Sequence, residues 1–249
     1  IENFVETGSE KTPSKVDIGP VNTFISKNFV DGIRLRASAR TTAKFNPHWF
    51  FEGYYAYGTK SHRSYYDAKV TYSFNKPEYQ PIEFPIRTLS FESNKDVESP
   101  SDKYLVHNKD NIFMTFRPVK VEKMAFINRQ KLNFMWETDY GLATSVELRT
   151  ESNVPTGKLI YEKMDGSLVD KVRMTELIVG LDYRPGQSYV NSKQQRMAVN
   201  LDAPEFKITH TMGIQNFLGS DFNTNLTEVS VYKRFWLGSW GHVDTRLQA

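Results

Sequence analysis

The sequence predicts an all-β protein, and within that class an antiparallel transmembrane β-barrel of which a large part is present. Three observations favour this fold. Polar and apolar residues alternate over segments of about ten residues, no long segment has helical periodicity, and aromatic residues make up 14% of the 249-residue chain. Alternation with period two indicates a strand with two different faces. A transmembrane β-strand needs about 9–11 residues, whereas soluble strands have about 5–6.

Residues 65–74, YYDAKVTYSF, alternate most clearly. Asp67 and Lys69 fall on one face together with Thr71 and Ser73, and we expect this face to line a polar lumen. The opposite face carries small and aromatic groups, which lipid tolerates better than a close-packed core does. The residues predicted to face lipid are Tyr66, Ala68, Val70, Tyr72 and Phe74.

The same alternation, interrupted by turn residues such as Pro47, predicts about 10–12 strands. No domain boundary stands out, so residues 1–249 are expected to be a single β-barrel domain with a polar lead-in at 1–16. The alternation continues to Ala249, and we expect the chain to be part of a longer protein with further strands. Loops are expected at 75–85 and 94–103, and 154–170 is ambiguous. The expected strands are 32–42, 48–59, 65–74, 86–93, 110–117, 130–138, 142–152, 172–186, one or two within 194–216, 225–238 and 240–249.

Charges of both signs lie on one face of these strands. In a barrel they would point into the lumen, where they can pair across strands and stay hydrated, whereas on an open sheet they would be an ordinary solvated face. Three arginines on one strand could also form a constriction that favours anions. Pairing with acids is the favoured interpretation, because 32 basic residues nearly match 29 acidic ones. The charged residues predicted to face the lumen are Arg34, Arg36, Arg40, Asp67, Lys69, Glu147 and Arg149.

Aromatic residues gather at the ends of the predicted strands. An aromatic ring is apolar while its OH or NH group prefers water, so a girdle of rings marks each edge of a membrane-spanning barrel. Aromatic residues also favour strands in general, which is the simpler explanation. The residues predicted to form the girdle are Trp49, Tyr57, Trp236 and Trp240.

Several classes of function find no support. The chain has no cysteine and no apolar run long enough for a membrane helix. It has no basic cluster of the kind that binds nucleic acid. No phosphate-binding or nucleophile motif occurs, and the five histidines are not spaced as metal ligands. Ser61–His62 is interpreted as a polar turn, and the acids Glu52 with Asp67 and Glu137 with Glu147 as lumen charges. We therefore expect no catalytic, cofactor or metal site.

Several segments resemble a Bacteroidetes outer-membrane β-barrel family of unknown function, in which a carboxypeptidase-regulatory-like domain often precedes the barrel. The resemblance covers most of residues 17–249 and implies a barrel in the bacterial outer membrane with no catalytic residues. Residues 181–186, LDYRPG, are also loosely similar to barrels of the outer-membrane assembly and two-partner secretion superfamily. The segments that carry the resemblance are GIRLRASARTT (32–42), 51–79, FPIRTLSFES (84–93), 181–190, 203–223 and 229–249.

Three hypotheses about function follow. The first is a non-enzymatic barrel for transport or translocation across the outer membrane, or for its assembly. The second is an accessory or scaffold barrel that binds other outer-membrane or periplasmic proteins, for which a filled lumen and long ordered loops, such as 75–85 and 94–110, are expected. The third is a soluble β-sandwich binding module. The expected partners are outer-membrane lipid and, under the second hypothesis, other outer-membrane or periplasmic proteins, and no cofactor is expected.

Overall fold

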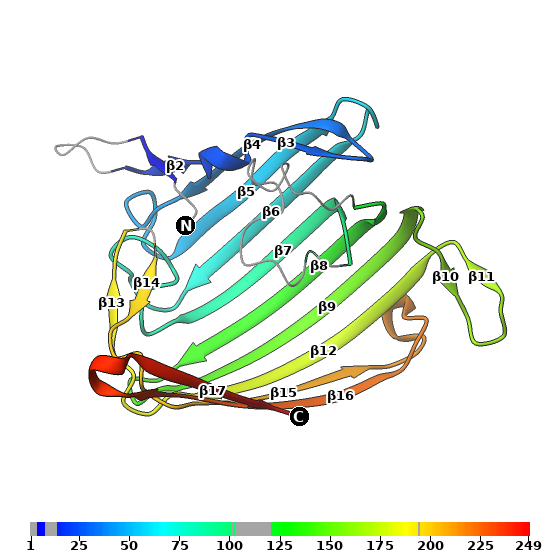
Figure 1. Ribbon diagram of the computed structural model, residues 1–249. Coiled ribbons are helices and arrows are strands. Elements are labelled where there is room, and N and C mark those ends of the chain that lie inside the picture. The colour runs from blue at the N-terminus through cyan, green and yellow to red at the C-terminus, as the bar shows by residue number, and fades with distance from the viewer. Residues whose placement is uncertain (1–3, 8–13, 101, 103–120, 194) are drawn as a thin grey trace.

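The computed structural model describes residues 4–7, 14–100, 102, 121–193 and 195–249. These residues form an all-β, antiparallel protein (Figure 1). Its main sheet has 13 strands, in the order β1-β2-β4-β5-β6-β7-β8-β9-β12-β15-β16-β17, with β3 also paired to β4. In the described part of the chain the only helices are short 3-10 turns, and none is long and apolar enough to cross a membrane.

The long strands connect in sequence as a meander. Two short hairpins, β10–β11 and β13–β14, project from its connections. We call the edge that carries the connections 59–63 and 158–171 rim 1, and the edge that carries 42–48, 138–141 and 237–241 rim 2. The strands are β1 (Val5–Glu6), β2 (Val16–Ile18), β3 (Ile25–Asn28), β4 (Gly32–Thr41), β5 (Trp49–Gly58), β6 (Ser64–Ser73), β7 (Arg87–Glu98), β8 (Lys123–Glu137), β9 (Leu142–Gly157), β10 (Tyr161–Glu162), β11 (Leu168–Val169), β12 (Val172–Tyr183), β13 (Tyr189–Asn191), β14 (Arg196–Ala198), β15 (Glu205–Gly213), β16 (Thr224–Trp236) and β17 (His242–Gln248).

The expected strands are confirmed where the alternation is regular, as in β4, β5, β6, β12, β16 and β17. Three boundaries were wrong. The segment 94–103 was expected to be a loop, but β7 continues to Glu98, and β8 and β9 also extend further toward rim 1 than predicted. Polar composition hid the extension of β7. The expected lead-in 1–16 contains strand β1 and the start of β2, and the expected strand 110–117 lies outside the described residues.

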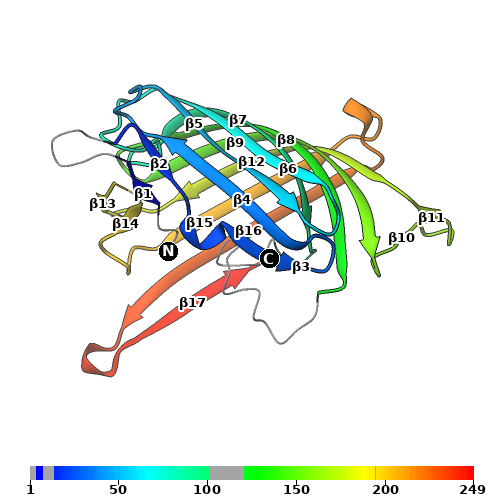
Figure 2. The same cartoon turned by 90° about the horizontal axis from the view of Figure 1, so that it is seen from above.

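Alternation gives the sheet a charged face and an apolar face. Tyr65 and Thr71 on the charged face of β6 are buried, whereas Tyr66 on its apolar face is 39% exposed. The sheet curls in both views (Figures 1 and 2). The Arg34 guanidinium of β4 lies 2.7 Å from the Asp96 carboxylate of β7, although flat strands in these positions would be roughly 14 Å apart. Side chains converge in this way only on the concave side, so the charged face is concave.

A buried ionic cluster joins β4 to β7 near rim 1. Arg34 and Asp31 are fully buried and Asp96 nearly so. The Tyr65 hydroxyl donates a 2.5 Å hydrogen bond to Asp31, and the Tyr54 hydroxyl donates one to Asp96. Both carboxylates therefore share one guanidinium and several hydroxyl donors, which is the arrangement that makes buried charge tolerable.

Glycine is required next to this cluster. A Cβ atom at Gly58 would lie 2.5 Å from the Asp31 carboxylate and 2.5 Å from the Ser61 hydroxyl. The Ser61 hydroxyl itself donates a 2.7 Å hydrogen bond to Asp31. The absence of a side chain at position 58 therefore lets the β3–β4 turn dock against the end of β5.

The two edges of the main sheet differ. β2 pairs with the rim 2 half of β4 and β3 with its rim 1 half, so both halves of β4 are covered along this edge. At the other end of the strand order, β17 pairs with β16, and all of its residues are exposed. In the described part of the chain no strand pairing joins β17 to the β1–β4 edge, so this sheet is curled but open.

The buried cluster predicts a large stability effect. Replacement of Arg34 by Met should lower the free energy of unfolding by about 3–5 kcal/mol, because two buried carboxylates lose their cation. The change should be measured by urea unfolding of detergent-refolded protein. The control is Lys158→Met, which breaks a pair with Glu122 that is exposed at both residues and should cost about 1 kcal/mol or less. Equal effects of the two changes would contradict this assignment.

Candidate functional site

One register row of the charged face runs across the sheet from β2 to β12. Each member lies directly opposite the next on the neighbouring strand, so all share one face. Acids and bases alternate along it except where Lys131 meets Arg149, and Glu176 then pairs with Arg149 at 2.7 Å. The row, which we call the charge ladder, consists of Asp17, Arg40, Glu52, Lys69, Glu92, Lys131, Arg149 and Glu176.

Several residues of the charge ladder form ion pairs. Lys131 lies 2.8 Å from Glu92, and Arg40 lies 3.5 Å from Asp17. Beside the ladder, Arg129 lies 2.5 Å from Glu151. The charges of acidic and basic residues on this face therefore largely balance one another, and the face is not a region of one charge sign.

The residues predicted to line the lumen all lie on the concave charged face. Arg34 belongs to the buried cluster, and Arg40, Lys69 and Arg149 belong to the ladder. Arg36 stacks over the Tyr54 ring at 3.8 Å, Asp67 accepts a 2.7 Å hydrogen bond from Asn94, and Glu147 lies 3.8 Å from Arg149. Arg34 and Arg40 pair with acids, as the favoured interpretation of the three arginines expected.

The apolar face has its own register rows. In the first row every residue is apolar from β5 to β15, and in the second from β5 to β12. The rows are Phe51, Val70, Phe91, Leu132, Leu148, Leu177 and Met212, and Trp49, Tyr72, Leu89, Phe134, Val146 and Val179. Four of the five residues predicted to face lipid, Tyr66, Ala68, Val70 and Tyr72, lie on this face of β6, and Phe74 follows the strand and is 45% exposed.

The predicted girdle residues lie near strand ends, and all four are exposed. Trp49 contacts Tyr72 in the edge-to-face geometry that aromatic rings favour, and the chain of ring contacts continues through Phe74 to Trp136. Tyr57 lies near rim 1. Trp236 lies on the charged face, together with Arg234. Trp240 lies in the turn before β17.

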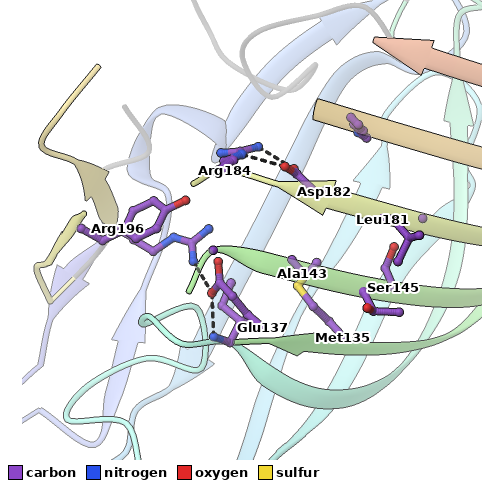
Figure 3. Close-up of a pocket in the computed structure, with 14 residues that line it drawn as sticks. Met135, Glu137, Ala143, Ser145, Leu181, Asp182, Arg184 and Arg196 are labelled. Atoms are coloured by element: carbon purple, nitrogen blue, oxygen red, sulfur yellow. Dashed lines mark hydrogen bonds and ion pairs between the residues drawn. The ribbon is translucent and has the colours of Figure 1, made fainter. Parts of the chain in front are cut away.

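A hollow of about 200 Å³ lies on the charged face near rim 2 (Figure 3). Arg196 of β14 reaches Glu137 at 2.6 Å across it, and Arg184 donates two hydrogen bonds to Asp182, at 2.9 and 2.7 Å. Burial disfavours the charge of Arg184, but Asp182 and Glu205 outweigh it and raise the pKa of the guanidinium. The cations of this hollow already have carboxylate partners, except Lys207, so it has no strong excess of charge.

Rim 2 is crossed by contacts between connections distant in sequence. The β13–β14 hairpin reaches the β1–β2 hairpin, where Lys193 lies 3.0 Å from Glu6 (Figures 1 and 2). The Tyr189 ring packs 5.0 Å from the ring of Phe84, in the connection between β6 and β7. These contacts place side chains across the rim 2 end of the concave space.

A hydroxyl in the β6–β7 connection ties it to the N-terminal hairpin. Tyr79 donates a 3.0 Å hydrogen bond to Asp17, which also accepts one from Ser14. Burial and this bond to a carboxylate raise the pKa of Tyr79 to about 12. The connection is therefore anchored by buried polar contacts.

The described residues contain no group of histidine and acidic side chains arranged to hold a metal ion. Ser61 and His62 lie in the β5–β6 turn, where Ser61 bonds Asp31 and His62 contacts Tyr57. Glu52 lies opposite Lys69 and Asp67 lies opposite Tyr54 in the register, which places the two acids diagonally on the same charged face. Glu137 forms an ion pair with Arg196, which is its partner in place of a second acid such as Glu147.

Sequence reasoning missed the residues that complete the buried cluster. Asp31 was not singled out because it lies in a turn, and Asp96 because it lies in a segment expected to be a loop. Tyr65 was given no role either. The signal that was present is the fixed alternation, since Tyr65 has the same parity as Asp67 and Lys69.

A family model described as "Family of unknown function (DUF5686) C-terminal domain" matches residues 5–249. No curated protein matches the chain.

The charge ladder predicts energetic coupling between neighbouring strands. Glu92→Lys should destabilise the protein by about 1 kcal/mol, because it places like charges opposite each other. Lys131→Glu alone loses the attraction to Glu92 but gains one to Arg149, so its net effect should be small. The double variant Glu92→Lys/Lys131→Glu restores the attraction and should be more stable than the sum of the single changes predicts. Urea unfolding of all four proteins measures this coupling, and additivity within about 0.3 kcal/mol would contradict it.

Proposed function

We propose that this chain, which belongs to the DUF5686 C-terminal domain family, is the barrel part of a non-enzymatic bacterial outer-membrane protein. Its role would be passage of a substrate across the outer membrane or assembly of that membrane. The observation that carries the proposal is the opposite chemistry of the two faces of one curled sheet. Continuous apolar rows cover the convex face, and a compensated charge ladder crosses the concave face.

The apolar residues of the convex face form a band across the sheet, which we call the apolar band. Its position along the strands supports a tilted arrangement of strands. On β4 the band includes Ile33 and Leu35 near rim 1, whereas on β16 and β17 it includes Phe235 and Val243 near rim 2. The band therefore drifts along the strands from one edge of the sheet to the other. Strands that tilt by 35–45° in a membrane barrel require such a drift, because the membrane cuts each strand at a different height.

The concave face fits a hydrated interior. Its charges pair across strands, and its ladder contains both signs, so the face is neither a dry core nor an obvious ion-selective surface. In a soluble sandwich the buried side would be apolar and the charges would face water. Here Arg34, Asp31 and Asp96 are buried, while Phe51, Phe91 and Leu132 are 44–49% exposed.

The contacts across rim 2 favour a second candidate function, an accessory or scaffold barrel with an obstructed interior. The connection 75–85 is held by Tyr79 and Phe84, and the β13–β14 hairpin joins it to the N-terminal hairpin. This agrees with the expectation of ordered connections for a scaffold. The second expected connection, 94–110, forms part of β7 up to Glu98, and residues 103–110 lie outside the described residues.

Cysteine substitution tests the two faces separately, because the chain contains no cysteine. Neighbouring residues give matched pairs: Leu132→Cys with Asn133→Cys, and Leu89→Cys with Ser90→Cys. In reconstituted vesicles, probes at 132 and 89 should be quenched by lipids brominated in the acyl chain. Probes at 133 and 90 should be quenched by aqueous iodide instead. Quenching by iodide alone at both members of each pair would overturn the membrane placement and favour a soluble β-sandwich binding module.

The role of the barrel is tested on the full-length protein. It should fractionate with Sarkosyl-insoluble outer membrane and migrate differently on gels before and after heating. Single-channel conductance then separates the two candidate functions, since a transport barrel conducts ions and an obstructed scaffold does not. Deletion of residues 189–198 should raise conductance if this hairpin obstructs the interior. A soluble periplasmic protein without a heat shift would contradict both candidates.

A further inference from the structure

We propose that the apolar face carries, near rim 1, a binding row for the phosphate-bearing headgroups of membrane lipids. This inference rests on the proposed membrane placement and adds a lipid class to it. The row, which we call the donor row, lies beyond the apolar rows on the rim 1 side. It consists of Tyr55, Tyr66, Lys95, Asn128, Ser152 and Arg173.

The donor row follows from the register. Tyr66 lies opposite Lys95, Lys95 opposite Asn128, and Ser152 lies opposite both Asn128 and Arg173. All therefore share the face of Val70 and Leu132. Each side chain has an N–H or O–H group to donate, and Lys95, Asn128 and Arg173 are exposed. Hydroxyl, amide, ammonium and guanidinium donors in one row suit a layer of phosphate oxygens.

The sign of charge differs sharply between the faces. In the described strands of the main sheet every carboxylate falls, by register and alternation, on the charged face. The charged residues of these strands that lie on the apolar face are all cations, and they lie toward strand ends. They are Lys27, Lys95 and Arg173 toward rim 1, and Arg87 and Lys233 toward rim 2. A face designed for water would carry both signs. Cations alone at the edge of an apolar band fit a surface of anionic headgroups.

The two rims are not equivalent. Near rim 2, Arg87 lies 3.7 Å from Asp139 and the Lys233 ammonium donates to the backbone oxygen of Asp202. Near rim 1, the ammonium of Lys95 and the guanidinium of Arg173 have no carboxylate partner within the described part of the chain. Asp221 lies beside this end of β12, and its carboxylate accepts a hydrogen bond from the backbone N–H of Arg173. The geometry therefore assigns the anionic lipid to rim 1.

The distance between the two cations of the donor row fits several neighbouring headgroups rather than one small anion. Lys95 on β7 and Arg173 on β12 are separated by three strand spacings, roughly 14 Å. Asn128 and Ser152 lie between them. The Asn128 carbonyl oxygen accepts a 2.6 Å hydrogen bond from Gln130, which leaves its NH₂ group to donate outward. A single phosphate cannot touch both cations, whereas neighbouring headgroups along the membrane surface can.

The test uses a reporter next to the donor row. Thr150→Cys lies one row closer to the apolar band, between Lys95 and Arg173, and is the one cysteine within residues 1–249. It is labelled with a fluorophore in the full-length protein after replacement of any cysteine outside these residues by serine. Brominated phosphatidylglycerol and brominated phosphatidylcholine in mixed micelles then serve as quenchers. The reporter should show preferential quenching by phosphatidylglycerol. Lys95→Gln/Arg173→Gln should weaken the apparent phosphatidylglycerol affinity roughly fivefold for each charge removed, with phosphatidylcholine unchanged.

The control removes two cations from the opposite face. Lys69→Gln/Arg149→Gln changes the net charge by the same amount but should leave the preference intact. Equal preference in the wild type and the Lys95/Arg173 variant would overturn the headgroup row, as would an equal loss in the control. In either case quenching by phosphatidylcholine would still support the membrane placement. Absence of quenching by either lipid would instead overturn the membrane placement itself.

Discussion

The backbone register of the antiparallel meander is the constraint on which the rest of the structure depends. Because side chains alternate strictly along each strand, a register fixed at one pair sorts every later pair into the same two faces. A slip of one residue between β7 and β8 would place Lys131 among Phe91 and Leu89, and Leu132 among the acids. The charge ladder and the apolar rows therefore reinforce one register, and each makes the alternatives costly.

Curvature adds contacts that register alone does not produce. The concave face brings Arg34 to Asp96 across two intervening strands, and the β3–β4 turn supplies Asp31 as a second carboxylate. Tyr54 and Tyr65 donate to these carboxylates from the strands between. Residues from β4 to β7 thus form one buried polar unit. A small apolar cluster of Ala56, Tyr65, Val97 and Met124 packs beside it near rim 1.

The two rims give the proposed barrel a direction. Connections meet across rim 2 through Lys193, Glu6, Tyr189 and Phe84, and cations of the apolar face are paired there. Near rim 1, β8 and β9 extend beyond the apolar rows and the cations of the donor row face outward. The proposed obstruction at rim 2 and the proposed headgroup binding at rim 1 are different tasks. The same sheet can separate them because its strands are long enough to reach past the apolar band on one side.

The amino-acid pattern alone predicts the all-β class, most strand positions and the two faces of β6, because period two is a local property of the chain. It indicated that Arg34 and Arg40 pair with acids, but it could not name Asp96 or Asp17, since these partners lie on other strands. It also missed the rim 1 extension of β7, where polar residues obscure the alternation. The register rows, the burial of Asp31 and the contacts across rim 2 arise only in the folded sheet. These depend on the curl of the sheet, which brings together residues that no local pattern connects.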